Sequence, residues 1–491
     1  MATNSEYSSK EILVHPKGWE CSPESERFPL SLMGHIMPKI YVLIAEVYAL
    51  PEDANAETIV KNMTTGLEVA LSQFPILTGI LEVDATNGQM WVAKQRSSTL
   101  SLHVKYMLCE DEFPSYEELE KKEFPATLIA GNRLLPESVT AKQLHSPLGD
   151  NNDEGIAMAK FQLNFIRGGL IIGVAVHHAL SDGPGCDGFL TAWAQNSAAA
   201  ANGTPFLRDQ QQFDIHRSSL DVEKPNPERM AEIRHAFPVI KDAGGPMPLP
   251  PADFKIPSFV PQMWHFSKTK AEMLKVQASS SGGEGSWIST YDAIIALLWS
   301  SVTHAKLALL NPDLESKALL VHAVNTRKIW NPPLPQNFLG VASAPARCEP
   351  LLIKDIIATE NLPKLAASVR ASIKAMTPQY LTGLLERVAG HEDQRWLEIS
   401  VNSFLGMDFG ASSWQGMTTY EKHDFGFGLP KALRWPSPAF DGFVFVYPSR
   451  AATKDAAADE GIEACVCLEE SCQQRLMKDE VLLAYAQPRG L

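Results

Sequence analysis

The chain has 491 residues, more than one simple core usually holds, so we expect two domains. Hydrophobic residues make up 45% of it and charged residues 20%, which is the composition of a globular protein and excludes a disordered or fibrous one. The 57 acidic residues outnumber the 43 basic residues, and the formal net charge is −14. Because nucleic-acid binding depends on neutralising phosphates, this balance argues against that function.

Signals for membranes, secretion and disulfides are weak throughout the sequence. No apolar run approaches the roughly 20 residues that span a bilayer, so we expect no membrane association. The start, MATNSEYSSKE, lacks the basic and then apolar order of a secretory signal. The seven cysteines show neither a disulfide framework nor paired zinc spacings. We therefore expect a monomeric, cytoplasmic protein with no metal site.

Hydrophobic periodicity predicts alternating strands and helices in the first 200 residues. Apolar positions at Ile59, Met63 and Leu67 recur at helical spacing, and Phe74-Pro75 ends that segment. Two apolar runs flank Arg167-Gly168-Gly169, which is typical of two strands joined by a tight turn. In chain order, the pattern predicts a strand near 41–50, a helix over 56–73, strands near 80–83 and 90–92, a short helix over 116–122, strands over 161–166 and 170–176, and a helix over 185–201.

Prolines cluster between residues 202 and 262, and we interpret this stretch as the crossover between domains, with one helix near 228–236. Cys465 and Cys467 fall on one face of a late strand, where packing is their expected role. Beyond the crossover, the pattern predicts a strand at MWHFS, helices over 270–278 and 291–307, and strands over 318–324, 443–447 and 461–468. The predicted domains are residues 1–205 and 263–491, joined by a crossover over 206–262.

The most informative segment is HHALSDG, from His177 to Gly183. It follows LIIGVAV at 170–176, a short Val- and Ile-rich run that favours a buried strand. The strand therefore ends on an imidazole, beside a Gly-Pro-Gly turn that lets another molecule approach. The unperturbed pKa of imidazole lies near neutrality, which suits proton transfer. By itself this segment leaves metal binding and simple turn chemistry open.

A second segment, DFGFGLP, begins at Asp424, 246 residues after His178. It is preceded by Ser412-Ser413-Trp414. Together these segments resemble the BAHD acyltransferases, whose signatures are HHxxxDG and, later in the chain, DFGWG. Other segments fall in the family's order, namely FPILTG at 74–79, WISTYDAIIALLW at 287–299, VNTRKIWNPPLPQNFLG at 324–340 and VFVYPSR at 444–450. The resemblance covers nearly the whole length, and the N-terminal MPKIYV looks more like the fungal members.

This resemblance implies an α/β fold of two similar-sized αβ domains of the chloramphenicol-acetyltransferase-like type, with an active-site channel at their interface. It also implies that Asp182 points away from the channel and pairs with an arginine. The matching residue in this chain is Arg327, in VNTR. An ion pair between Asp182 and Arg327 would fix the loop behind His178, because a buried charge needs a partner.

The second signature is expected to be structural. Two glycines and an Asp suit a tight loop in which Asp424 bonds its own backbone, and the resemblance implies the same role for Gly426 and Gly428, remote from the chemistry. Phe427 stands where the family usually has Trp. That change keeps the aromatic bulk and removes an N–H donor, so any role that required the donor is in doubt.

By resemblance to the family's [ST]SW segment, Ser412 and Trp414 are expected to line the channel near the acyl group, where a hydroxyl can donate to an oxyanion. Core packing and a turn are the alternative roles. Ser289 and Thr290 precede the long helix in the second half, and helix N-termini favour anions, so we predict contacts with the cofactor's pyrophosphate there. Weaker candidates for phosphate contacts are Lys268 and Lys270.

Thioester alcoholysis needs a base and stabilisation of an oxyanion. A neutral His178 can take the proton and pass it to the departing thiolate, so we predict direct attack with no acyl-enzyme. Cys186 and Ser181 are the candidate nucleophiles for a two-step alternative. Asp182 invites a triad interpretation, but it and His178 straddle a strand-to-turn transition and need not share a face.

The expected function is transfer of an acyl group, most simply acetyl, from acyl-CoA to a hydroxyl of a small secondary metabolite, with no tightly bound cofactor. One alternative is a condensation enzyme of the peptide-synthetase type, which shares HHxxxDG but uses a carrier protein. An N-acyltransferase is another, and a non-catalytic binding protein is a third.

Overall fold

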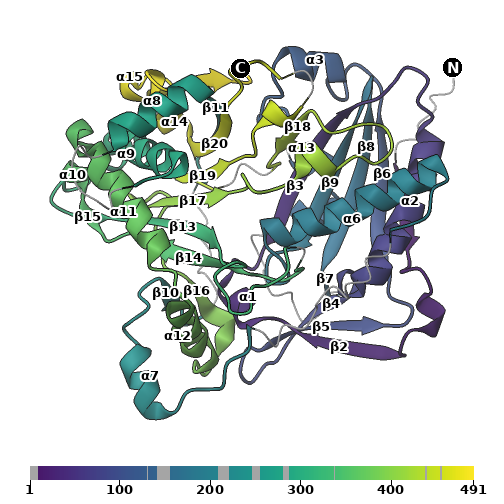
Figure 1. Cartoon of the computed structure of the whole chain (residues 1–491), viewed down its shortest axis with the longest axis horizontal. Helices are drawn as coiled ribbons and strands as arrows, with labels where there is room; N and C mark the ends of the chain where they lie inside the picture. Colours follow the sequence, from purple (N-terminus) through teal and green to yellow (C-terminus); the bar gives the residue numbers. More distant parts are fainter. Residues whose placement is uncertain are drawn as a thin grey trace.

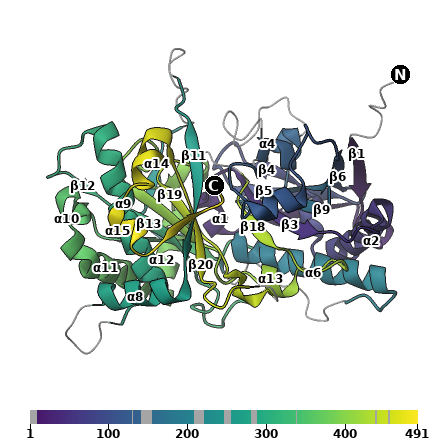
Figure 2. The ribbon, with the colours of Figure 1, turned by 90° about the horizontal axis from the view of Figure 1, so that it is seen from above.

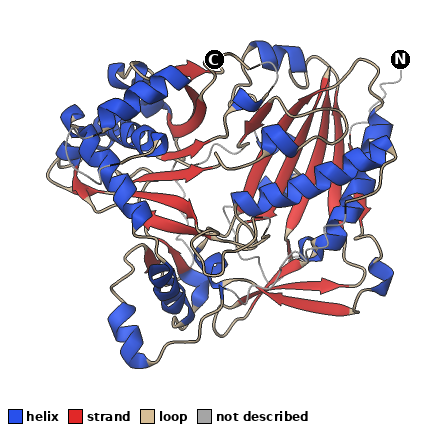
Figure 3. Ribbon diagram, viewed as in Figure 1, coloured by secondary structure: helices blue, strands red, loops and turns tan. Residues whose placement is uncertain are grey.

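A computed structural model describes residues 9–129, 131–140, 155–207, 220–245, 255–279, 287–336, 338–436, 440–453 and 456–491. Within these residues the chain forms two large β-sheets, each flanked by helices (Figure 1, Figure 3). Seen from above, the early part of the chain occupies one side of the molecule, and most of the later part occupies the other (Figure 2).

The sheet of the first half has six strands in the order β1-β6-β8-β9-β3-β18. Its strands are β1 (Ser9–Val14), β6 (Leu100–Met107), β8 (Ala159–Ile166), β9 (Gly169–His177), β3 (Tyr41–Ala49) and β18 (Ala432–Arg434). Helices α2 (Ala56–Gln73) and α6 (Gly183–Asn202) pack together on one face, where Trp193 stacks on Phe161 with ring centroids 5.1 Å apart. The chain between Phe113 and Leu134 covers the other face. Strand β9 is therefore buried along its whole length, which explains its continuous apolar run.

The sheet of the second half has seven strands in the order β14-β13-β17-β19-β20-β11-β21. Its strands are β14 (Ser343–Arg347), β13 (Leu320–Asn325), β17 (Phe409–Ser413), β19 (Phe443–Val446), β20 (Ile462–Glu469), β11 (Phe259–Phe266) and β21 (Gln487–Arg489). Pairs β13–β17 and β17–β19 are parallel. Helices α8 (Lys268–Ala278), α9 (Thr290–Leu310), α11 (Leu362–Lys374) and α14 (Glu470–Leu476) pack with this sheet around a second hydrophobic core.

Helix α9 is the one helix among the described residues that is long and apolar enough to cross a membrane. This corrects the expectation that no segment approaches that length. The apolar part of α9 is 67% buried inside the protein, where it contacts α8, α11, α14, α10 (Ile353–Ile357) and α15 (Glu480–Leu483). Its apolar composition is explained by its place at the centre of the second core.

Smaller elements complete the described fold. The other α-helices are α1 (Leu32–Ile36), α3 (Tyr116–Lys121), α4 (Gly131–Leu134), α5 (Glu137–Thr140), α7 (Pro227–Ile233), α12 (Pro378–Ala389) and α13 (Thr419–Lys422). A four-stranded sheet has the order β2-β5-β4-β7, with β2 (Ser25–Pro29), β5 (Met90–Gln95), β4 (Ile80–Val83) and β7 (Ile156–Ala157). Two strand pairs remain, β10 (Ile240–Asp242) with β16 (Leu397–Ile399) and β12 (Lys317–Ala318) with β15 (Leu351–Leu352).

The predicted crossover over 206–262 is corrected at its end, because β11 begins at Phe259. The sequence pattern did not predict the first residues of this strand because they include Pro261, and proline rarely lies inside a sheet. The structure accommodates Pro261 because β21 pairs only with Met263, Trp264 and His265, so no described strand lies beside β11 on that side at Pro261. Within the same stretch, α7 corresponds to the predicted helix, and β10 was not foreseen. The predicted domain boundaries stay a prediction.

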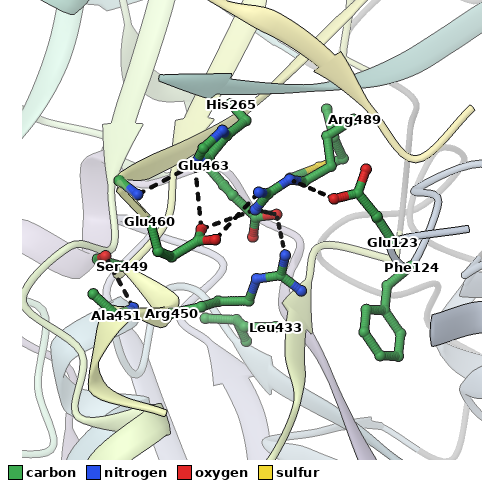
Figure 4. A network of polar contacts seen from close by, with 12 residues as sticks. Glu123, Phe124, His265, Leu433, Ser449, Arg450, Ala451, Glu460, Glu463 and Arg489 are labelled. Carbon is green, nitrogen blue, oxygen red and sulfur yellow. Dashed lines mark hydrogen bonds and ion pairs between the residues drawn. The ribbon is translucent and has the colours of Figure 1, made fainter. Parts of the chain in front are cut away.

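The two halves are interlocked. Strand β18 comes late in the chain yet pairs with β3 of the first sheet, with Ala432 opposite Val47. Arg434 is the last residue of β18. Its buried side chain donates to the carbonyls of Glu123 and Phe124 and to the carboxylate of Glu463 on β20. Figure 4 shows the same network around Glu463, in which Arg489 also bonds Glu460 and Glu463. Buried charges thus join the two sheets.

Candidate active site

His178 directly follows β9, and its backbone N–H donates to the carbonyl of Ile40 at 2.7 Å, so the residue continues the pairing with β3. Its Nδ1 lies 3.1 Å from the carbonyl oxygen of Ser181. A carbonyl can only accept, so Nδ1 carries the hydrogen and the Nε2 atom carries a lone pair. The turn therefore selects the tautomer in which Nε2 can act as a base.

The imidazole of His178 lines a cavity between the two halves, and Nε2 has no hydrogen-bond partner among the described residues. Burial lowers the pKa of His178 below its usual value, although the Asp182 carboxylate opposes this change. The ring is therefore neutral at pH 7, and it presents an acceptor to whatever enters the cavity. Its neighbour His177 is buried away from the cavity, with its Nδ1 accepting from the N–H of Ala179.

The carboxylate of Asp182 binds Arg327 rather than His178. Its Oδ1 accepts from Nη2 of Arg327 at 2.7 Å, and its Oδ2 accepts from Nη1 at 3.0 Å. The carboxylate of Asp182 also accepts hydrogen bonds from three further donors, the N–H groups of Gly185 and Ala342 and the hydroxyl of Ser343. The ion pair predicted from the sequence is therefore present, and it is buried on both sides.

This ion pair fixes the turn after His178 against the second half of the protein. Asp182 caps the N-terminus of α6, whereas Arg327 follows β13 and also donates to the carbonyls of Phe338 and Gly340. Burial alone would raise the pKa of Asp182, but the guanidinium of Arg327 outweighs it and holds that pKa below its usual value. Asp182 is therefore ionised and fully bonded, which suits a positioning role and leaves no hydrogen bond to His178 for a triad.

The cavity has a volume of about 370 Å³, and both halves of the chain form its walls. The first half contributes Met37, Pro38 and residues 40–43, together with His178 and the turn after it. The second half contributes one face of its sheet, through β13, β14, β17 and β19. Further lining residues from the second half are Glu398, Ile399, Val401, Ser403, Trp435 and Phe440.

Ser412 and Trp414, at the end of β17, line the same cavity as His178. Trp414 is only 4% exposed, and its indole Nε1 lies against Gly183, where an added Cβ would be 3.1 Å away. Neither the indole N–H nor the Ser412 hydroxyl has a hydrogen-bond partner among the described residues. The cavity that His178 lines thus also holds two unused donors, which an oxyanion would require.

The two candidate nucleophiles lie outside the cavity wall. Cys186 is fully buried on α6, and burial raises the pKa of its thiol to about 12. Ser181 is also buried, and its hydroxyl donates to the backbone carbonyl of Asp182. Both side chains are packed into the first half, so the geometry favours direct attack.

The segment predicted to bind the cofactor caps α9. Ser289 and Asp292 form a capping box, and the Asp292 carboxylate also binds Arg370. Asp292 thus places a negative charge in the first turn, where a pyrophosphate would need positive potential. Ser289 and Thr290 do not line the cavity, and Lys268 and Lys270 donate to backbone carbonyls. The role of these residues in cofactor binding stays a prediction.

The DFGFG segment is remote from the cavity wall. Asp424 accepts hydrogen bonds from the N–H groups of Gly426 and Gly428 at 2.8 and 2.9 Å, as the loop chemistry predicted. Gly426 has φ of +101°, and an added Cβ would lie 2.9 Å from Ala201 of α6. Only glycine fits there. The ring of Phe427 packs on Tyr48 of β3.

Sequence reasoning missed a buried charge cluster beside this segment. The imidazole of His423 lies 2.6 Å from Glu46 on β3 and 3.3 Å from Asp187 on α6. Burial by itself lowers the pKa of His423, but the two carboxylates outweigh it and raise the pKa to about 10. Two residues of the first half thus hold a cation from the second half. No short-range pattern predicts such a contact.

Comparisons with known proteins identify the family of this chain. The model of the Transferase family matches residues 133–481, and the model of the trichothecene 3-O-acetyltransferase-like N-terminal domain matches residues 40–195. Acetyltransferase FGR3 of Gibberella zeae is 28% identical over 489 residues, covering 97% of this chain and 94% of the relative. Trichothecene 3-O-acetyltransferase TRI101 of Fusarium sporotrichioides is 25% identical, covering 96% of this chain and 98% of the relative.

Solved structures share the fold. The crystal structure of F. graminearum TRI101 complexed with coenzyme A and deoxynivalenol matches with a TM-score of 0.75 at 20% identity, covering 94% of this chain and 99% of that one. Vinorine synthase matches with a TM-score of 0.64 at 18% identity, covering 98% of each chain. These likenesses confirm the predicted two-domain α/β fold. Because the family model spans more than half of its length, the chain belongs to the Transferase family, that of the BAHD acyltransferases.

Proposed function

We propose that the protein transfers an acyl group, acetyl in the first instance, from acyl-CoA to a hydroxyl of a small secondary metabolite, with His178 as the general base. The observation that carries this proposal is the Nε2 lone pair of His178, which is unpartnered among the described residues and faces a cavity that both halves form. The choice of acetyl and of a hydroxyl acceptor is supported by relatives that carry the name 3-O-acetyltransferase. An amine acceptor remains the alternative.

The proposed reaction is a single displacement through a tetrahedral intermediate. The acceptor oxygen attacks the thioester carbon while Nε2 of His178 takes the hydroxyl proton. The resulting oxyanion lies near the indole N–H of Trp414 and the hydroxyl of Ser412, which donate to it. The carbon–sulfur bond then breaks, and the imidazolium returns the proton to the CoA thiolate. Atoms and charge balance without a covalent enzyme intermediate.

Asp182 and Arg327 are positioning residues in this scheme. They do not touch the reacting atoms. Their ion pair holds the 178–185 turn so that the carbonyl of Ser181 meets Nδ1 of His178. Rigid support of this kind matters because a general base must lie within hydrogen-bond reach of its proton.

The test is the release of free thiol from acetyl-CoA in the presence of a panel of hydroxylated small molecules. We expect thiol release to depend on the acceptor, to coincide with ester formation by mass spectrometry, and to be lost in His178→Ala. The matched control is His103→Ala, because His103 is a partly exposed histidine on β6 outside the cavity. Unchanged turnover in His178→Ala would refute the assignment of the base.

Two alternatives are separated by the same experiment. A carrier-protein-dependent condensation enzyme would leave acetyl-CoA intact and accept acyl groups only from a phosphopantetheine arm on a protein. A binding protein would bind the acceptor equally well with and without His178, with no thiol released by either. The cytoplasmic location and the monomeric state expected from the sequence stay predictions.

A further inference from the structure

We propose that one wall of the cavity selects an uncharged acceptor with a planar aromatic ring. The proposal rests on the proposed function, since it names the acceptor class of the same site. The wall, called the aromatic wall below, consists of Trp435, Phe440, Phe443 and Phe445, all of which line the cavity.

The alternation of side chains along β19 builds the first part of this wall. Val444 and Val446 are fully buried in the core of the second half. Phe443 and Phe445 face the opposite way, are only partly buried, and line the cavity. Successive strand residues point to opposite faces, so a single strand separates a closed core from an open aromatic surface.

The neighbouring strand β17 makes room for these rings. Gly410 lies opposite Phe443 in the register, and a Cβ at Gly410 would come within 2.4 Å of the Phe443 ring. The ring therefore lies across the backbone of β17. In the same register Ser412 lies opposite Phe445, and this small residue also lines the cavity. Because small residues lie beside the large rings, space is left in the cavity for a flat acceptor molecule.

The rings form a continuous path that starts beside the reaction centre. Trp414, which abuts Gly183, has its ring centroid 5.0 Å from that of Phe445. Phe445 is 4.3 Å from Trp435, and Trp435 is 5.3 Å from Phe440. Phe440 is 36% exposed, so the path runs from the proposed oxyanion site toward solvent. Ring centroids at these separations are typical of attractive aromatic contacts, which a guest ring can extend.

Charge in the cavity limits the guest to uncharged molecules. None of the described residues that line the cavity is a lysine or an arginine. The carboxylates in the lining are Asp182, which Arg327 neutralises, and Glu398, which pairs with Lys241 at 2.9 Å. A carboxylate or phosphate on the acceptor would lose its hydration without gaining a cationic partner, which is unfavourable.

The acyl donor is the other possible occupant of this wall, because its pantetheine arm must also reach His178. That arm carries two amides, and burying amides against rings without hydrogen-bond partners is unfavourable. Polar residues that line the cavity away from the wall lie on β13 and β14 and include Asn325 and Ser343, whereas Ser412, opposite Phe445, is the proposed donor to the oxyanion. We therefore assign the aromatic wall to the acceptor and treat the pantetheine arm as an outcome of the test.

The test uses three matched probes: 2-naphthalenemethanol, its fully saturated decahydro counterpart, and 2-naphthoate. Binding is measured by calorimetry on the His178→Ala variant, which removes turnover, and acetyl transfer from acetyl-CoA to the two alcohols is measured with the unaltered enzyme. The saturated alcohol is at least as apolar as the aromatic one, so burial of apolar surface alone predicts no preference for the ring. We expect the aromatic alcohol to bind roughly threefold to tenfold tighter, and 2-naphthoate to bind weakest.

Phe445→Leu keeps apolar volume and removes a ring of the wall. It should abolish the preference for the aromatic alcohol and leave the KM for acetyl-CoA within about twofold of its original value. The matched control is Phe28→Leu, because Phe28 is a partly buried ring on β2 outside the cavity. This control should retain the preference, which separates loss of the wall from loss of stability.

Four results are distinguishable. Equal binding of the two alcohols, or no binding of any probe, overturns the aromatic wall. A raised KM for acetyl-CoA in Phe445→Leu, without a change for the alcohol, assigns the wall to the donor and overturns the proposal. Ring-selective binding that needs Phe445 but leads to no acetyl transfer supports the wall and counts against the proposed function. Acetyl transfer to both alcohols at equal KM supports the function alone.

Discussion

The two signature segments of this chain, HHALSDG at 177–183 and DFGFG at 424–428, differ in what the fold does with them. The first ends a buried strand at the cavity, where Nε2 of His178 has no described partner. The second lies outside the cavity wall, with Asp424 bonded to its own loop and Phe427 packed on the first half. A recurring motif therefore identifies a family without telling where the chemistry occurs.

The two segments differ physically in whether the polar groups in and around them have hydrogen-bond or ion-pair partners. The first segment has one unused acceptor, Nε2 of His178, and the cavity that it lines also holds two unused donors, Trp414 and Ser412. Around the second segment the charged groups are paired, since His423 lies between Glu46 and Asp187. Unused polar groups in a cavity can bind a reacting molecule, whereas paired ones hold the two halves together.

The largest expected effect is a difference in kcat between a variant of the first segment and a variant of the second. We expect His178→Gln to lower kcat by roughly 10²- to 10⁴-fold, the usual contribution of a general base, with little change in unfolding temperature. Asp424→Asn keeps an Oδ1 acceptor for Gly426 and Gly428, so its kcat should change less than twofold. Thiol-release kinetics and thermal unfolding of both variants check this. Similar losses of kcat in both variants would show that the two segments share the chemistry.

Breaking the ion pair behind the first segment should cost stability. Arg327→Met leaves the buried Asp182 carboxylate without its cation, and we expect a loss of about 3–5 kcal/mol in the free energy of unfolding. The control is Arg27→Met, which breaks an exposed pair with Glu82 and should cost less than about 1 kcal/mol. Denaturant titration measures both. Equal losses in the two variants would contradict a structural role for the buried pair.

The charge cluster behind the second segment should make stability depend on pH. The pKa of His423 is raised to about 10 in the folded protein, above its unfolded value near 6.5. The unfolded chain therefore holds fewer protons on this residue between these values, so its contribution is complete below about pH 6.5 and is lost as pH rises through 10. The gap in unfolding free energy between the unaltered protein and His423→Gln should narrow from pH 6 to pH 9.5. A constant gap would show that His423 is not held as a cation.

The pH dependence of turnover should come from His178, whose pKa is lowered, whereas the pKa of His423 is raised. Burial lowers the pKa of His178, so the base stays unprotonated to more acidic pH than an ordinary histidine. We expect kcat/KM to fall only as pH drops below about 6.5, with the acidic limb at a pKa under that of free imidazole. A pH–rate profile for an uncharged acceptor measures this. An acidic limb above pH 6.5 would indicate a different titrating group.

The smallest effect is expected at the position where the second segment departs from its family. Phe427→Trp restores the indole N–H, yet Phe427 contacts the rings of Tyr48 and Phe425 and lies outside the cavity wall. We expect kcat to stay within about twofold and the free energy of unfolding to change by less than about 1 kcal/mol. A tenfold gain in kcat would show that the absent indole N–H affects turnover and that the second segment influences the reaction at the first.

The sequence by itself predicted what depends on neighbouring residues. Helices α2, α6 and α9 and strands β3, β8, β9 and β20 lie where periodicity placed them, because burial of one face repeats every few residues along the chain. The resemblance of two short segments to a family also pointed to His178 and to the pairing of Asp182 with Arg327. The helices α10, α11 and α12 were not predicted, although the buried residues of α11 and α12 recur at helical spacing.

The tertiary structure decided which distant segments meet. Strand β18 joins the first sheet, His423 lies between Glu46 and Asp187, and the cavity takes lining residues from both halves. Each of these contacts depends on how the two halves pack, and a one-dimensional pattern carries no information on that. The sequence pointed to His178 as the proposed base, and only the packing of two sheets around it created the cavity in which a base can act.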